Sequence, residues 1–99
     1  MSFKAISRVR FPDSMRDKVI SVGVKMLPIA KQQAGLISVS FNESIDSNET
    51  VMIWDWESKA DHEACMVSED WAQLMQESAS IFQSEAVEFS ISYYESVAI

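Results

Sequence analysis

One histidine lies in a stretch rich in large rings, VMIWDWESKADHEA, which covers residues 51–64. Histidine changes charge near neutral pH and is the side chain most often used to accept a proton from a reacting group. His62, the only histidine in the sequence, is therefore the candidate catalytic base. Its neighbours Asp61 and Glu63 favour the protonated form, whereas a nearby helix N-terminus favours the neutral form. A solvated histidine on a helix surface explains the same residues, and both interpretations stay open.

Three tryptophans, Trp54, Trp56 and Trp71, are candidates for the wall of a pocket. Rings at strand or helix spacing commonly belong to a hydrophobic core, but each indole N–H also needs a hydrogen-bond partner or a wet edge. Trp56 is the residue that we favour for lining a pocket, because it ends a strand next to a helix start, where clefts form. We expect the rings of Trp54 and Trp56 to belong to the core and to border a cavity with their far edges.

Alternation along the last expected strand places Phe89 and Tyr93 on the side of the tryptophans and Tyr94 on the opposite side. Tyr93 could then offer its hydroxyl group to a substrate oxygen. Asn42 falls on the same side of its strand as Ser40, so it is expected to point away from the pocket unless a bulge reverses it.

The composition limits the class of function. The chain has 99 residues, of which 47% are apolar, and this predicts one folded domain over residues 1–99. Fifteen acidic and eight basic side chains give a net charge of −7, which disfavours nucleic acid and anionic membranes as partners. The start of the chain resembles neither a signal peptide nor a membrane span, and a single cysteine, Cys65, suits a reducing compartment, so we expect a cytoplasmic protein. The sequence shows no nucleotide-binding loop, metal-ligand cluster or nucleophile triad, and we expect no metal.

Periodicity of two and of 3.6 predicts the elements that must hold these residues. A cap at Ser14 should begin the first helix, and Pro28 should kink or stop it near Leu27. Ser58 and Ser68 should cap the later helices. The expected order is a strand at 3–11, a helix closed by 34–35, strands at 36–42 and 51–57, a helix at 58–66, a helix from 68 to 82 and a strand at 85–94.

This order predicts an α+β fold of the ferredoxin-like type, in which two split β-α-β halves form a four-stranded antiparallel sheet with all helices on one face. The other face carries basic residues on the first strand, Arg8 and Arg10, and acidic residues on the third and fourth, Asp55, Glu57 and Glu88. A few apolar residues interrupt them. Such a mixture suits either a face that packs against a second sheet or a solvated face.

The segment from Gly35 to Leu74 resembles the antibiotic biosynthesis monooxygenase domain of the dimeric α+β barrel superfamily. The shared features are the glycine that opens the second strand, the hairpin, the strand that ends in Trp56-Glu57-Ser58, the short helix, and a serine-initiated helix with Trp71 in its first turn. Element order and length match over nearly the whole chain.

The resemblance implies a homodimer that pairs through the sheet face, with a pocket in each subunit between the sheet and its helices. It also implies a monooxygenase that acts on a small aromatic or quinol-type molecule and uses no cofactor. His62 would be the catalytic base. The substrate-binding wall would consist of Trp54, Trp56, Trp71, Phe89 and Tyr93.

Two other functions compete with this one. A non-catalytic dimeric module would bind a small apolar ligand in the same pocket without proton chemistry. Haem degradation is disfavoured, because that branch of the family is expected to carry a histidine ligand on the later helices, and residues 64–82 contain none. Cys65 or Met66 could ligate iron, but a lone cysteine on a helix is usually a small buried apolar group.

Overall fold

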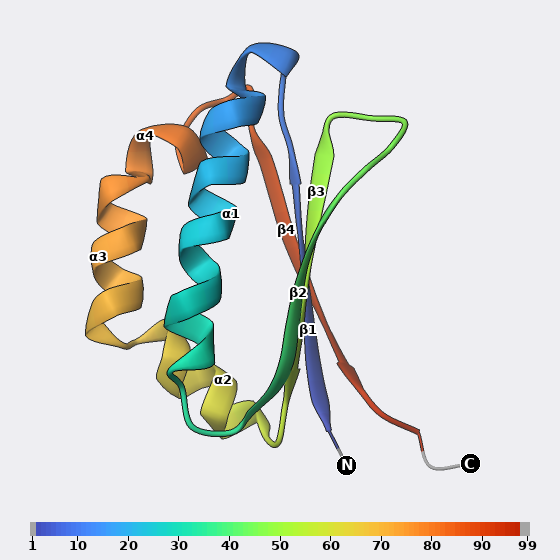
Figure 1. The fold of residues 1–99 in the computed structure, drawn as a ribbon, viewed down its shortest axis with the longest axis vertical. Helices are drawn as coiled ribbons and strands as arrows, with labels where there is room; N and C mark the ends of the chain where they lie inside the picture. The colour runs from blue at the N-terminus through green and yellow to red at the C-terminus, as the bar shows by residue number, and fades with distance from the viewer. Residues whose placement is uncertain (1, 98–99) are drawn as a thin grey trace.

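The computed structural model describes residues 2–97 and contains a four-stranded sheet with helices packed on one face (Figure 1). The elements are β1 (Phe3–Arg10), a 3-10 turn (Asp13–Met15), α1 (Arg16–Lys31), β2 (Leu36–Glu43), β3 (Glu49–Trp56), α2 (Lys59–Met66), α3 (Glu69–Glu77), α4 (Ala79–Phe82) and β4 (Glu88–Glu95). All neighbouring strands are antiparallel, in the order β2-β3-β1-β4. The predicted ferredoxin-like α+β fold is confirmed.

The two central strands fix which side chains face the helices. Ala5 of β1 pairs with Trp54 of β3 on one side and with Tyr93 of β4 on the other. Trp54 and Trp56 are both buried, as alternation along β3 predicts, whereas Ile53, the residue before Trp54, is 37% exposed on the outer face. The helix-facing side of β3 is therefore a wall of large rings.

The start of α1 differs from the prediction. Ser14 does not cap the helix, because the 3-10 turn comes first and Met15 takes the cap position without a side-chain bond. Pro12, with its fixed φ of −71°, leads into this turn, and the N–H of Met15 donates to the Pro12 carbonyl.

The expected stop at Pro28 is also wrong, since α1 continues through it to Lys31. The kink, which was the other expected effect, stays a prediction. Proline removes one helical N–H and leaves the carbonyl four residues earlier, that of Val24, without its partner. The Val24 side chain is 53% exposed, so this part of the helix faces water, which can bond the freed carbonyl.

The helix and the strand in the C-terminal third are shorter than the sequence predicted. The expected helix from 68 to 82 is divided at Ser78 into α3 and α4, and β4 begins at Glu88 instead of at 85. Val87 is buried ahead of the strand, in a small cluster with Phe11 and Val19.

In β2, a bulge between Leu36 and Ser38 leaves Ile37 54% exposed, so Ile37 does not join Val39 and Phe41 on the inner face.

Glycine is required at two places. Gly35 has a φ of +84° in the turn into β2, a conformation that side chains rarely adopt. On α1, a Cβ atom at Gly23 would lie 2.2 Å from the ring of Phe41, so the missing side chain lets the helix approach β2. Within residues 2–97, no helix is long and apolar enough to cross a membrane.

Candidate functional site

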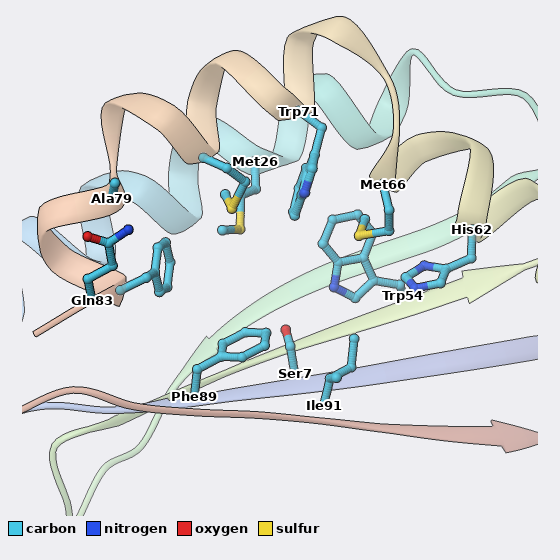
Figure 2. A pocket seen from close by; sticks show the side chains of 12 residues that line it. Ser7, Met26, Trp54, His62, Met66, Trp71, Ala79, Gln83, Phe89 and Ile91 are labelled. Atoms are coloured by element: carbon cyan, nitrogen blue, oxygen red, sulfur yellow. The ribbon is translucent and has the colours of Figure 1, made fainter. Parts of the chain in front are cut away.

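A cavity of about 320 Å³ lies between the sheet and the α2, α3 and α4 helices (Figure 2). Its lining is almost entirely apolar. The lining residues are Ser7, Met26, Trp54, His62, Met66, Trp71, Met75, Ala79, Phe82, Gln83, Phe89 and Ile91. This volume is at the small end of the range for sites that bind organic ligands.

The cavity has a polar group at each end and one in the middle. Figure 2 shows His62 next to Met66 at one end, Gln83 next to Ala79 at the other, and the Ser7 hydroxyl group rising from the sheet between them. A flat ligand between these ends would lie over β1 and β3 and under α3.

Helix α2 places His62 at this end of the cavity. The predicted cap is present: the Ser58 hydroxyl oxygen accepts from the Asp61 N–H at 3.2 Å, and Ser58 also donates to the Asp61 carboxylate at 2.9 Å. The helix therefore begins directly after β3, and His62 and Met66, four residues apart, face the same side.

His62 is only 3% exposed and is surrounded by four aromatic rings. Its ring centroid lies 5.5 Å from Tyr93, 5.7 Å from Phe3 and 5.7 Å from Trp56, and 6.4 Å from Trp54. Neither ring nitrogen has a hydrogen-bond partner among the described residues. The interpretation as a solvated surface histidine is therefore wrong.

Burial lowers the pKa of His62 below its ordinary value of 6.5, because the apolar surroundings disfavour the charged imidazolium. The carboxylate of Glu63 acts in the opposite direction, but its effect is the smaller one. The imidazole is therefore neutral at pH 7. In this form it offers one N–H donor and one nitrogen acceptor.

Three of the five expected wall residues line the cavity: Trp54, Trp71 and Phe89. The indoles of Trp54 and Trp71 meet edge to face, with centroids 5.4 Å apart and planes at 73°. Phe89 meets Phe82 in the same way at 6.0 Å and closes the far end. These pairs hold the walls in fixed orientations.

Trp56 and Tyr93 do not line this cavity. Trp56 is fully buried behind Trp54, on which it stacks at 6.0 Å, and its indole Nε1 has no partner among residues 2–97. Tyr93 stacks on Phe3 at 5.5 Å and covers His62 from the edge strand, with 53% of its surface exposed. Both residues surround the histidine and lie outside the cavity lining.

Several lining residues were not predicted. Ser7 occupies an inward position of β1, and it is the one polar residue in the inward series Phe3, Ala5, Ser7 and Val9, a signal that was visible in the alternation. Gln83 has no such signal, because its position depends on the break between α3 and α4.

Two other residues that the sequence analysis considered, Cys65 and Asn42, lie outside the cavity lining. Cys65 is buried, and burial raises the pKa of its thiol to about 11, so it is an inert apolar group. Asn42 points outward, as predicted, and donates to the Ser40 hydroxyl and the Val51 carbonyl, each at 3.2 Å. Residues 2–97 contain no group of three or more His, Cys, Asp or Glu side chains arranged to hold a metal ion.

No protein-family model and no curated protein matches this sequence. Solved structures, however, match its fold over nearly their whole length. Rv0793 from Mycobacterium tuberculosis is 14% identical, with a TM-score of 0.85 over 100% of this chain and 98% of that one. An antibiotic biosynthesis monooxygenase is 13% identical, with a TM-score of 0.82 over 97% and 99% of the two chains.

SnoaB, a cofactor-independent oxygenase from Streptomyces nogalater, is 10% identical, with a TM-score of 0.80 over 99% of this chain and 95% of its own. At such identities the likeness is one of fold. The resemblance to the antibiotic biosynthesis monooxygenase domain, inferred from the segment that ends its strand in Trp56-Glu57-Ser58, is confirmed at that level.

Proposed function

We propose that this chain, which has the fold of antibiotic biosynthesis monooxygenases, is a cofactor-independent oxygenase of small aromatic hydroxyl compounds. One observation carries the proposal: a buried, neutral imidazole with two unpartnered nitrogens lies at the end of an apolar cavity. Buried polar groups are normally hydrogen-bonded, so we expect an unpartnered histidine in a cavity wall to form a hydrogen bond with a ligand oxygen. The proposed base is His62, and the proposed contacts for the aromatic rings are Trp54, Trp71 and Phe89.

The low pKa of His62 selects among substrates. An ordinary phenol has a pKa of about 10 and the imidazole has one below 6.5, so proton transfer is uphill by at least about 5 kcal/mol. This cost is acceptable as part of a catalytic barrier, but it favours hydroxyl groups made more acidic by conjugation with a carbonyl group. A quinol-type substrate that carries a carbonyl group on the same ring system therefore fits better than a simple phenol.

The following steps need only dioxygen as co-substrate. The His62 imidazole takes the hydroxyl proton, and the resulting anion passes one electron to dioxygen, which becomes superoxide. The two radicals join through a new C–O bond on a ring carbon that carries hydrogen, and the imidazolium returns its proton to the peroxide. Cleavage of the O–O bond then releases water, which carries away the hydrogen of that carbon, and leaves a carbonyl group. One dioxygen therefore gives one quinone and one water.

The apolar walls support this chemistry in two ways. They exclude water from the radical pair and the peroxide, and Trp54 and Trp71 present ring surfaces on which a planar substrate can stack. The supply of protons from solvent is restricted as well, since Tyr93 and Phe3 cover His62 on the side away from the cavity.

The proposal includes a homodimer formed through the outer face of the sheet. Ile53 and Tyr94 on that face are 37% and 50% exposed, and an ion pair between Lys4 and Asp55 at 3.1 Å lies near them. The Oδ1 atom of Asp55 is buried, yet it has no hydrogen-bond partner among the described residues. Sedimentation equilibrium should give twice the chain mass, and Ile53→Lys should give the monomer mass.

The alternative is a non-catalytic module that binds an apolar ligand, and the apolar lining itself favours it, because such a wall can hold a ligand without proton chemistry. Oxygen uptake distinguishes the two functions. With polycyclic hydroquinones and no added cofactor, the chelator-treated protein should consume dioxygen and form one quinone with an added oxygen atom, and one water in place of hydrogen peroxide, for each dioxygen. Tight binding of the same compounds without oxygen uptake would identify the binding module instead.

A further inference from the structure

A second, much smaller cavity of about 20 Å³ lies between α1 and the middle of the sheet. It shares Ser7, Met26, Phe82 and Phe89 with the large cavity, so these four side chains form the boundary between the two spaces. Figure 2 shows Ser7 near the middle of the large cavity, and Met26 and Phe89 on the Gln83 side of it. The small cavity therefore borders the large cavity away from the end that His62 occupies.

The size of the small cavity restricts its occupant. A cavity needs roughly 10–15 Å³ of this kind of volume to hold one water-sized molecule. At about 20 Å³, this one has room for a single molecule of two or three atoms.

The chemistry of the wall favours an apolar occupant. Val9 on β1 and Val19 on α1 belong to the wall together with Met52, and the polar side chains are the hydroxyl groups of Ser7 and Thr50. A buried water normally makes about three hydrogen bonds to such groups, whereas apolar cavities stay dry and accept apolar gases.

We propose that the small cavity holds dioxygen next to the organic substrate. This inference rests on the proposed function, because a cofactor-independent oxygenase has no metal to concentrate dioxygen and must meet it beside the substrate. The anion that His62 creates gives one electron to a dioxygen molecule waiting across the boundary formed by Ser7 and Phe89. The superoxide then has only that boundary to cross before it bonds to the ring.

The first test is independent of turnover. Dioxygen is paramagnetic, so methyl protons near it relax faster under oxygen pressure. Under oxygen pressure, the relaxation rates of the methyl protons of Val19 and Met52 should increase at least several-fold more than that of Val24. Val24 is the reference because it is 53% exposed on the same helix as Val19. In Val9→Ile, where one added methyl group fills the space, the enhancement at Val19 and Met52 should fall to the level of Val24.

The second test concerns kinetics and uses a matched control. Val9→Ile should raise the KM for dioxygen several-fold and leave the KM for the hydroquinone unchanged, whereas Val24→Ile should change neither. If Val9→Ile fails to fold, Val19→Ile fills the same space from the helix side. An ordered water in the small cavity, or equal enhancement in the native and filled proteins, overturns the proposal. Protein that shows the methyl enhancements and no oxygen uptake keeps the gas cavity and refutes the proposed oxygenase.

Discussion

The imidazole of His62 packs against the indole of Trp56 with ring centroids 5.7 Å apart and planes at 64°, and the nitrogens of both rings lack hydrogen-bond partners within residues 2–97. A buried polar group without a partner costs about 1–3 kcal/mol. The fold therefore carries a penalty at one end of the cavity, which a ligand oxygen at His62 would partly remove. The same packing keeps the imidazole neutral and ready to accept a proton.

Stability should depend on pH through His62. The pKa of His62 is lowered in the folded chain, so below the ordinary value of 6.5 the unfolded chain binds a proton that the folded chain does not. The free energy of unfolding should therefore fall as the pH drops from 6.5 toward the folded-state pKa and should be insensitive to this group above 6.5. Urea denaturation at several pH values measures this slope, and His62→Gln should flatten it. An equal slope in both proteins would mean that other groups cause it.

The pH dependence of activity should follow the same group. Activity requires neutral imidazole, so kcat/KM should rise with pH to a plateau whose midpoint lies below 6.5. Glu63 raises the pKa of His62, and Glu63→Gln should shift the midpoint to lower pH without lowering the plateau. Rates of oxygen uptake across the pH range measure both midpoints. A midpoint that does not move would show that a different group titrates.

The cavity should close when its wall is enlarged. Ala79 lines it and is half-buried, whereas Ala72 on α3 is exposed and lies outside the lining. Ala79→Leu should weaken the binding of a hydroquinone analogue by about tenfold or more, and Ala72→Leu should leave it unchanged. Quenching of the fluorescence of Trp54 and Trp71 reports the binding. Equal affinity in both variants would place the ligand elsewhere.

Cys65 should be unreactive in the folded protein. Its side chain is buried and its pKa is raised to about 11, so almost no thiolate is present at neutral pH. A thiol-specific reagent should modify it only at the rate of unfolding, and at full rate in denaturant. Fast modification of native protein would contradict this placement.

The sequence predicted the architecture well because strong alternation and capping dominate it. The Ser58 cap and the inward tryptophans of β3 are local features, and the structure contains both. The stop expected at Pro28 is absent, because the effect of this proline depends on whether the freed carbonyl faces water, which is a tertiary property.

The candidate site was predicted only in part. The position of His62 on its helix was predictable, but its burial depends on Phe3 and Tyr93, which come from the two ends of the chain. Trp56 was placed on the wall because it ends a strand, yet Trp54 stands between it and the cavity. Such layering follows from tertiary packing and is absent from the local pattern.

The most direct test of the central claim compares oxygen uptake by the native protein and by His62→Ala with polycyclic hydroquinones and no added cofactor. If His62 is the base, uptake should fall by about 10²–10⁴-fold in the variant, which is the usual contribution of a positioned base. Fluorescence quenching should show that the variant still binds the hydroquinone analogue and is therefore folded. Undiminished uptake by a folded His62→Ala protein would show that His62 is not the base.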